Sequence, residues 1–538
     1  MINKSLLKEH QKMDSSLNLE YNNVCDLLSA KVKENNEKVF LICPGKDNDQ
    51  FTYSEFKAIV DQTSKFLIQS GLKKNDKISL IFHNSPEFLI LYFAGLSCGL
   101  TIVPINPDLS SREIKYIIED SDSKHVFYNY TLESKIDSIG NNLTDVILIK
   151  TRTIKELISS TSNKINFEQN KTSLYDTAVI IYTSGTTGNP KGVLYSHRSN
   201  LIHSMGTAGG DMFDLRANDS FLLIVPMFHA NSWGLSFSVP MLGGKMVLPG
   251  PYMDGKSICE IIQAESCNKT CAVPTVMTSL IDYLDANDLQ IPSLIETYVG
   301  GSAVPRSMIE GFEDRYDVDV IHGWGMTELN PVGVFSRPLP FMGELNFEQR
   351  MEIRCKQGRP PFGLEIKIVD DEGNSLPHDG VAFGKLMVRG PWVVERYYKA
   401  KESALDSEGW FDTGDVSTID KHGFMQITDR AKDIIKSGGE WISSVDIENT
   451  AVGHPEVQIA ACLGVKHVKW EERPLLIAVK KEGCDPSKAS ILDIISSEHA
   501  KWQLPDDVVF IDEMPLTATG KIDKKPLRIK YENYLMEE

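Results

Sequence analysis

The chain has 538 residues, of which 41% are hydrophobic and 24% are charged, a composition typical of a soluble globular protein. A single hydrophobic core stops growing beyond roughly 250–300 residues, so this length predicts at least two domains. The net charge of −18 excludes nucleic acid and anionic lipid surfaces as stable partners, because both select for an excess of Lys and Arg.

The nine cysteines are scattered without a CxxC pair, which argues against a disulfide framework or a zinc site. The stretch MINKSLLKEHQKMDSS at residues 1–16 is polar and lacks the apolar core of a signal peptide. The most apolar stretch, residues 88–103, is too short to span a bilayer. We therefore expect a cytoplasmic protein with no integral membrane segment.

From residue 77 onward the chain alternates between predicted strands and helices. The predicted strands include 78–82, 101–105, 124–129, 221–226 and 245–250. The predicted helices include 86–99, 111–122, about 197–205 and 233–242. Such alternation predicts parallel sheets that are covered by helices on both faces.

From Gln357 the pattern changes to short strands separated by glycine, as in GKLMVRG and GFMQITDR, which predicts a β-rich subdomain at about 357–430. After the charged stretch DRAKDIIKSGGEW (429–441), an α+β pattern begins that has the size of an independent domain. The predicted fold class is therefore α/β. A large N-terminal domain of doubly wound sheets covers 1–431 and includes the β-rich subdomain, and a small α+β C-terminal domain covers 432–538.

The stretch IIYTSGTTGNPKGV (180–193) combines a buried strand with a turn rich in glycine, hydroxyls and one lysine. Glycine permits close backbone approach, and the hydroxyl and ammonium donors suit an anionic ligand such as a polyphosphate. The spacing is not that of the common P-loop, because Gly188 is followed by Asn189, Pro190 and Lys191. Taken alone, the stretch fits an ordinary turn equally well.

Three further stretches place polar residues where predicted strands end. They are TYVGGSAVP (297–305), IHGWGMTEL (321–329) and WFDTGD (410–415). In doubly wound sheets the ligand crevice lies at such strand ends. Trp324 between glycines can lie flat on a purine, Glu328 can hold Mg²⁺ beside phosphates, and Asp415 can accept hydrogen bonds from a ribose. Each residue alone is typical of a turn or a core, but their joint occurrence indicates a nucleotide site.

The motifs YTSGTTGNPKG, GWGMTE, GWFDTGD, DRAKDIIKSGGEWIS and PLTATGKIDK, in this order, resemble those of the AMP-forming adenylate-forming superfamily. The resemblance covers essentially the whole chain. It implies two half-reactions, in which a carboxylic acid and MgATP give an acyl-adenylate and pyrophosphate, and CoA then displaces AMP. Its small-molecule partners are therefore an acid, ATP and CoA, with Mg²⁺ as cofactor and no side-chain nucleophile.

The resemblance assigns roles to residues that match the family motifs. It implies that Lys521, Thr327 and Glu328 are catalytic and that Thr183 and Glu328 hold the metal. The implied ATP- and AMP-binding residues are Thr183, Ser184, Gly185, Thr186, Thr187, Lys191, Gly301, Ser302, His322, Gly323, Trp324, Gly325, Thr327, Asp415, Arg430 and Lys432. The implied acyl- and CoA-binding residues are His229, Ala230, Trp233, Gly301, Lys436, Gly438, Gly439 and Trp441.

Three of these assignments have further implications. Lys432 falls at the family's hinge, so the C-terminal domain is expected to be mobile and to withdraw Lys521 between the half-reactions. Trp233 is expected to act as a gate of the acyl pocket, although a buried tryptophan is also typical of an ordinary core. Trp324 departs from the more common tyrosine at the adenine-stacking position.

Within the superfamily, PMFHANSWGL (226–235) and KSGGEWISSVDIEN (436–449) resemble the fatty-acyl-CoA synthetase branch, which also contains 3-methylmercaptopropionate ligases. We expect medium- to long-chain fatty acids as substrates, with short methylthio acids as the alternative. The alternative functions are a luciferase-type oxygenase, a stand-alone carrier-loading enzyme and a non-catalytic binding protein. The resemblance also makes a homodimer an expectation.

Overall fold

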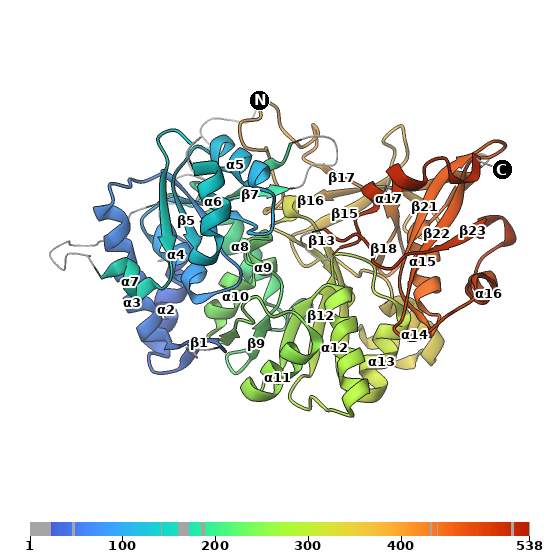
Figure 1. The fold of residues 1–538 in the computed structure, drawn as a ribbon, viewed down its shortest axis with the longest axis horizontal. Helices are drawn as coiled ribbons and strands as arrows, with labels where there is room; N and C mark the ends of the chain where they lie inside the picture. The colour runs from blue at the N-terminus through green and yellow to red at the C-terminus, as the bar shows by residue number, and fades with distance from the viewer. Residues whose placement is uncertain are drawn as a thin grey trace.

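The computed structural model describes residues 23–45, 49–140, 143–159, 172–183, 189–430, 433–437, 440–517 and 521–536, without the side chains of Arg430, Glu440 and Trp441. Figure 1 shows the blue and teal N-terminal elements at one end, the green elements beside them and the red C-terminal elements at the other end.

The first region is built on a six-stranded sheet with the order β6-β5-β3-β4-β7-β8. All neighbouring strands are parallel except β7 and β8, which form an antiparallel pair. The strands are β3 Lys77–Ile81, β4 Thr101–Ile105, β5 Ser123–Asn129, β6 Ile147–Thr151, β7 Thr177–Thr183 and β8 Lys191–Ser196. The helices of this part are α2 Cys25–Glu34, α3 Tyr53–Gln69, α4 Pro86–Ser97, α5 Ser111–Asp120, α6 Glu133–Gly140 and α7 Ile154–Ile158.

The second region is an eight-stranded sheet with the order β14-β13-β12-β11-β9-β10-β1-β2, antiparallel only at its two edges. Its strands are β1 Val39–Cys43, β2 Asp49–Thr52, β9 Ser220–Leu223, β10 Lys245–Val247, β11 Lys269–Ala272, β12 Glu296–Gly300, β13 Asp319–Gly325 and β14 Val332–Phe335. Its helices are α8 His197–Thr207, α9 Ala230–Trp233, α10 Leu235–Leu242, α11 Gly255–Glu265, α12 Pro274–Asn287, α13 Arg306–Tyr316 and α14 Phe347–Arg354.

Helix α4 lies in the shared core of the two sheets. The Ser85 hydroxyl accepts a hydrogen bond from the Phe88 N–H and Pro86 occupies the first turn, so the helix begins with a cap and a preset φ. Its apolar side chains are buried on every face, as expected for a helix without a solvent side. The largest buried cluster includes α4 together with strands of both sheets, and it fixes the two sheets relative to each other.

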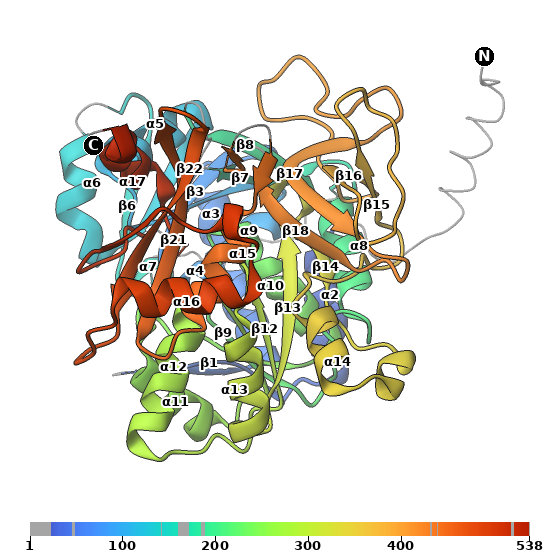
Figure 2. The ribbon, with the colours of Figure 1, turned by 90° about the vertical axis from the view of Figure 1, so that its right-hand side faces the viewer.

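The remaining sheets are antiparallel for the most part. The β-rich sheet has the order β15-β16-β17-β18, with strands Glu365–Val369, Phe383–Arg389, Phe411–Ile419 and Met425–Arg430. The C-terminal sheet contains β19 Ile435–Ser437, β20 Glu440–Ile442, β21 Val457–His467, β22 Glu471–Lys480 and β23 Asp507–Phe510. Helices α15 Ser444–Val452, α16 Lys488–Glu498 and α17 Lys524–Tyr531 complete this region, and Figure 2 shows it from its outer side.

The predicted fold class is confirmed, since mixed α/β sheets form a large N-terminal domain that is followed by a small α+β C-terminal domain. The predicted boundary at residues 431 and 432 lies outside the described residues. No helix in the described part of the chain is long and apolar enough to cross a membrane.

Three predicted elements need correction. The strand predicted at 245–250 ends at Val247. The strand predicted at 221–226 ends at Leu223, because the Asn84 side-chain amide takes up the carbonyl groups of Leu223 and Val225 at 2.8 and 3.0 Å. The helix predicted at 233–242 begins only at Leu235, because the residues before it have left-handed backbone. The apolar pattern of that stretch does not distinguish a right-handed helix from a buried turn.

Candidate active site

The candidate site lies where β7, β12 and β13 end, together with the turns that follow these strands. Thr183 is the last residue of β7, Gly300 ends β12, and Gly325 ends β13. A short 3₁₀ turn, η2 Thr327–Leu329, follows β13. β12 and β13 are parallel neighbours, so their carboxyl ends share one edge of the eight-stranded sheet, whereas β7 belongs to the six-stranded sheet.

Lys191 and Glu328 both contact Tyr397, a residue that the sequence analysis did not identify. The Tyr397 hydroxyl donates a hydrogen bond to Oε1 of Glu328 at 2.9 Å. The Lys191 ammonium lies 5.3 Å from the centre of the Tyr397 ring, within the range of a cation–π interaction. Lys191 also pairs with Thr183 across the β7–β8 ladder. Tyr397 therefore joins the lysine of the Gly/Thr turn to the carboxylate of the β13 turn.

The turn that carries Thr327 and Glu328 is buried and held by its backbone. Thr327 and Glu328 are each 8% exposed. The Tyr195 hydroxyl donates to the Thr327 carbonyl at 2.6 Å, and the Val394 N–H donates to the Glu328 carbonyl at 2.8 Å. These bonds fix the backbone of the turn, and the Tyr397 hydroxyl restrains the Glu328 carboxylate.

Trp324 on β13 and Asp415 on β17 form a hydrogen bond that joins two sheets. The indole Nε1–H of Trp324 donates to Oδ2 of Asp415 at 2.9 Å, and Asp415 is buried. Gly333 lies under the indole ring, where a Cβ atom would be 2.6 Å from the ring carbon Cε3. The ring is half-buried, as expected for a surface against which a ligand can stack.

His322 lies on β13 below this pair, with its ring fully buried. Its Nδ1 is 2.9 Å from the Cys355 carbonyl oxygen, which can only accept, so Nδ1 carries the proton. Burial lowers the pKa of His322 to about 4, and the imidazole is neutral at physiological pH. The side chain therefore serves as a neutral wall of the crevice.

Lys521 of the C-terminal domain reaches the turn that follows β12. Gly301 has a φ of +89°, and a Cβ atom built on it would lie 3.0 Å from Cε and 3.6 Å from Nζ of Lys521. Burial, and then the nearby charge of Lys521, lower the pKa of His229 to about 3. The lysine thus lies close to both the glycine turn and a neutral histidine.

Contacts between β18 and α15 fix this orientation of the C-terminal domain. The Ser444 N–H at the start of α15 donates to Oδ2 of Asp429 at 2.8 Å, and the Ser443 hydroxyl donates to the Thr428 carbonyl. Asp429 is 1% exposed. A carboxylate at a helix N-terminus is favoured by the exposed N–H groups and the helix dipole, so this contact stabilises the observed domain arrangement.

Ala230 and Trp233 belong to a left-handed turn, α9. Their φ angles are +47° and +58°, and Asn231 and Ser232 between them have φ of +56° and +50°. Left-handed backbone costs roughly 1–2 kcal/mol for each residue that is not glycine, so the turn needs strong support from its surroundings.

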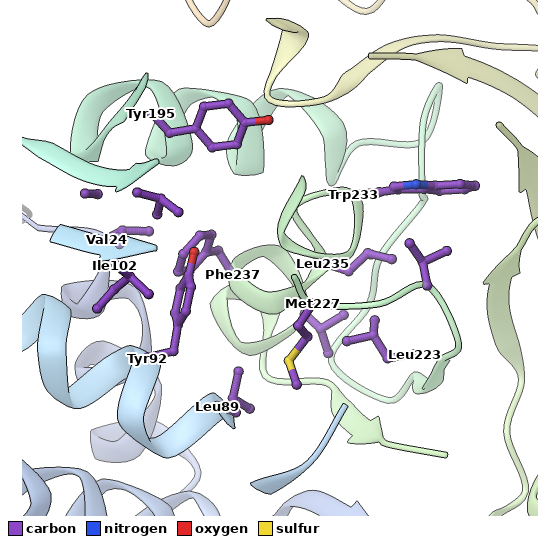
Figure 3. Close-up of a cluster of buried hydrophobic side chains, with 14 of the residues drawn as sticks. Val24, Leu89, Tyr92, Ile102, Tyr195, Leu223, Met227, Trp233, Leu235 and Phe237 are labelled. Carbon is purple, nitrogen blue, oxygen red and sulfur yellow. The ribbon is translucent and has the colours of Figure 1, made fainter. Parts of the chain in front are cut away.

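Trp233 is 8% exposed, and its Cη2 would lie 3.4 Å from a Cβ atom on Gly300. The indole therefore packs against the end of β12, one residue before the Lys521 contact at Gly301. Figure 3 shows Trp233 beside Leu235, with Met227 and Leu223 in the same cluster.

Some predicted site residues cannot be placed. Ser184, Gly185, Thr186, Thr187, Lys432, Gly438 and Gly439 lie outside the described residues, as do the side chains of Arg430 and Trp441. Ser302 is exposed beside Gly301. Lys436 has an exposed side chain on β19, and its N–H donates to Glu472 of the same domain at 3.0 Å. In this domain orientation the described contact of Lys436 is therefore made within the C-terminal domain.

The residues around Glu328 fit Mg²⁺. Within the described ranges there is no group of three or more His, Cys, Asp or Glu side chains that could form a protein cage for a metal. Mg²⁺ does not need one, because it is typically held by one or two carboxylates together with phosphates and water. The carboxylate of Glu328, which accepts a hydrogen bond from Tyr397, and the hydroxyl of Thr183 at the end of β7 are oxygen donors of the kind that Mg²⁺ takes.

Comparisons with known proteins show the family to which the chain belongs. Residues 28–398 match the family model of the AMP-binding enzymes, and residues 446–521 match that of the AMP-binding enzyme C-terminal domain. The 3-methylmercaptopropionyl-CoA ligase of Ruegeria lacuscaerulensis is 42% identical over 501 residues, which cover 90% of this chain and 92% of that protein. The medium-chain-fatty-acid–CoA ligase of Ectopseudomonas oleovorans is 42% identical over 487 residues, with 87% and 88% covered.

Among solved structures, that of the anthranilate CoA ligase AuaEII in complex with anthranoyl-AMP has a TM-score of 0.88 at 25% identity, and covers 97% of this chain and 99% of that one. The chain therefore belongs to the AMP-binding enzymes, a family of acid–thiol ligases. Within this family it is a member of the acyl-CoA ligases.

Proposed function

We propose that the protein converts an apolar carboxylic acid, ATP and CoA into acyl-CoA, AMP and pyrophosphate through an acyl-adenylate. Medium- to long-chain fatty acids are the proposed substrates. The observation that carries the proposal is the contact of Lys521 with Gly301, next to neutral His229 and the apolar turn that ends in Trp233. A cation at this point can neutralise the charge that develops when a carboxylate attacks a phosphate ester.

In the first half-reaction, a carboxylate oxygen of the acid bonds to the α-phosphorus of ATP and the bond to the pyrophosphate oxygen breaks. We assign Lys521 to the carboxylate and α-phosphate oxygens, and Thr183 and Lys191 to the β- and γ-phosphates. Trp324 stacks on the adenine and Asp415 accepts hydrogen bonds from the ribose. Because the reactants are charged and no enzyme nucleophile is used, the rate comes from alignment and neutralisation.

Glu328 and Thr183 would hold Mg²⁺, which supplies charge neutralisation to the phosphates when it is bound. Glu328 is held in place by the Tyr397 hydroxyl, as described above. The residues of the Gly/Thr turn at 184–187 belong to the same proposed phosphate site.

In the second half-reaction, the CoA thiolate attacks the acyl carbon and AMP leaves. We propose that the C-terminal domain turns at Lys432 for this step, withdraws Lys521 and brings Lys436, Gly438, Gly439 and Trp441 over the site. Such closure about a few residues is a common way to reuse one crevice for two reactions. A cytoplasmic location and a homodimer stay predictions of the sequence analysis.

The residues proposed to line the acid pocket favour a substrate acid with an apolar tail. The segment 226–235 contains no Asp, Glu, Lys or Arg, and burial keeps His229 neutral. An additional charge on the substrate would be buried without a partner, at a cost of several kcal/mol. Amino acids and dicarboxylic acids should therefore be rejected.

A second candidate is the short methylthio acid 3-methylmercaptopropionate. A ligase named for this acid and a medium-chain fatty-acid ligase are equally similar to the chain, at 42% identity each. The two candidates differ in tail length, which depends on how far the pocket extends past Trp233.

The test is acid-dependent release of pyrophosphate, followed by detection of the acyl-CoA. The panel contains 3-methylmercaptopropionate, linear acids from propionate to hexadecanoate, an amino acid, a dicarboxylic acid and benzoate. Each buried CH₂ contributes about 0.8 kcal/mol, so kcat/KM should rise about three- to fourfold per carbon until the pocket is full. An early plateau favours the methylthio acid, and a preference for aromatic or dicarboxylic acids would contradict the proposal.

A further inference from the structure

The left-handed turn α9 is the most unusual backbone segment near the candidate site. Four consecutive residues that are not glycine, 230–233, have φ between +47° and +58°. Single residues adopt this conformation in many proteins, but a run of four is rare because each Cβ crowds the backbone. The surroundings must therefore hold the turn in place.

A chain of buried side chains supplies this support. The Tyr92 hydroxyl, from α4, donates to Oδ1 of Asn231 at 2.5 Å. The Asn231 amide in turn donates from Nδ2 to Oδ1 of Asn200, from α8, at 3.2 Å. These three residues are 1–2% exposed. The turn is thus tied to helices on two sides of the core.

The direction of each of these hydrogen bonds follows from the orientation of the Asn200 amide. Nδ2 of Asn200 donates to the Ser196 carbonyl at 3.0 Å, so Oδ1 of Asn200 must accept. Asn231 therefore turns its amide nitrogen to Asn200 and its oxygen to Tyr92. Burial raises the pKa of Tyr92 well above its ordinary value, so the phenol remains a donor. Every member of the chain has only one satisfactory orientation.

The far side of the turn is closed by packing. Gly234 follows Trp233 with a φ of +81°, and a Cβ atom on it would lie 2.6 Å from Cε1 of His203. The Trp233 ring meets the end of β12 at Gly300. Figure 3 shows Tyr92 and Trp233 on opposite sides of this segment, with Phe237 next to Tyr92. Asn231 and Trp233 are only two residues apart in this turn. The hydrogen bond from Tyr92 to Asn231 therefore also restricts where the indole can lie.

We propose that Tyr92 and Asn231 are positioning residues that hold Trp233 against β12 and thereby determine which acids the pocket accepts. The proposal rests on the proposed function for its substrate class, which is linear apolar carboxylic acids. With the turn held, the indole forms a fixed wall against which short tails pack. Without it, the wall is loose, so short acids lose contacts while long acids gain space.

The test compares Tyr92→Phe with Tyr53→Phe. Tyr53 is a matched control, because its buried hydroxyl also makes a hydrogen bond in the same core, to the Gly244 carbonyl at 2.8 Å, away from the turn. In Tyr92→Phe, the ratio of kcat/KM for dodecanoate to that for butyrate should rise about five- to tenfold, the size expected for one lost buried hydrogen bond. The KM for ATP should stay unchanged. Tyr53→Phe should leave the ratio at the wild-type value.

Asn231→Gly provides a second variant, because glycine adopts left-handed backbone without steric cost and so protects folding. It removes both side-chain bonds of the turn, and the same shift in the acid ratio is expected in protein that still unfolds in one cooperative transition. An unchanged ratio in both variants, or an equal loss for all acids, overturns the proposal.

A spectroscopic readout separates this proposal from the proposed function. Acrylamide quenching of Trp233 is obtained as the difference between each protein and its Trp233→Phe counterpart, with and without Tyr92→Phe. The indole should become more accessible when Tyr92 is replaced, whether or not any acid is a substrate. If no apolar acid supports pyrophosphate release, the proposed function fails. Unchanged quenching, in contrast, overturns the positioning role.

Discussion

Lys521 and Gly301 are in contact although they belong to different domains and are far apart in sequence. The absence of a side chain at Gly301 leaves room for the Lys521 side chain, since a Cβ atom would be 3.0 Å from its Cε. This relationship places the one cation of the TGK motif at the end of β12, next to His229.

Gly301→Ala should therefore displace Lys521 as well as strain the backbone. Formation of the acyl-adenylate should fall about tenfold or more, because small misplacements of an aligned group are costly. Gly373→Ala is the matched control, since Gly373 has a φ of +87° and open space around it. The control should lose about 1–2 kcal/mol of unfolding free energy but no activity. Equal activity of the two variants would show that the contact is unimportant.

Loss of the Tyr397 hydroxyl should raise the Mg²⁺ concentration that the enzyme needs. Tyr397→Phe removes the donor to Glu328 but keeps the ring that faces Lys191. The Mg²⁺ concentration for half-maximal pyrophosphate release should rise about tenfold, as for other groups that orient a metal ligand. Glu328→Gln should have a larger effect.

Tyr398→Phe is the control for this experiment. Its hydroxyl donates to Asp122 at 2.7 Å, so its loss should not affect the metal. Matching titration curves for Tyr397→Phe and Tyr398→Phe would remove Tyr397 from the metal site.

Trp324 and Asp415 should act as a unit in nucleotide binding. Trp324→Phe keeps an aromatic ring but loses the donor to Asp415, and Asp415→Asn keeps the shape but loses the charge. Both variants should raise the KM for ATP. In a double-mutant cycle the effects should be non-additive by about 0.5–3 kcal/mol, as is typical of residues in contact. Additive effects would indicate that the hydrogen bond has no part in binding.

A buried ion cluster below the site should make stability sensitive to acid. Glu296 accepts from Arg337 at 2.7 Å and pairs with Lys269 at 3.0 Å. Burial alone would raise the pKa of Glu296, but these two cations outweigh it and lower the pKa to about 2. In the unfolded chain the carboxyl has its ordinary pKa of about 4.3.

Between these two pKa values the unfolded chain binds the additional proton. The stabilisation is therefore complete above pH ~4.3 and is lost as the pH falls toward 2. Urea unfolding at pH 3 to 7 should show this loss, and Glu296→Gln should reduce the slope and cost about 3–5 kcal/mol at pH 7. Glu348→Gln, at an exposed ion pair with Arg306, should leave the curve nearly unchanged. A wild-type slope in Glu296→Gln would contradict this assignment.

Much of the fold could be predicted from the sequence because its strands and helices carry strong local signals. The helix at 111–120 has a Ser110/Glu113 capping box, and the buried strand before the Gly/Thr turn is continuous and apolar. The left-handed turn could not be predicted in this way. Its residues have no glycine before Gly234, and the conformation depends on Tyr92 and Asn200, which are distant in sequence.

The same contrast applies to the candidate site. Glu328, Trp324 and Asp415 stand in motifs, so the resemblance identified them. Tyr397 does not, because its partner Glu328 is 69 residues away and no local pattern joins them. The tandem tyrosines of RYYKA (396–400) are the only signal in that stretch, and only the fold shows which of the two faces Glu328.

The most direct test of the account is the effect of Lys521→Ala on the two half-reactions, measured separately. Acyl-adenylate formation, followed as pyrophosphate release, should fall on the order of 10²–10³-fold, because a charge aimed at the transition state is lost. Thioester formation from supplied acyl-adenylate and CoA should remain close to wild type, as should both half-reactions in the exposed control Lys525→Ala. An equal loss of both half-reactions in Lys521→Ala, or no loss of the first, would contradict the assignment of Lys521 to adenylation.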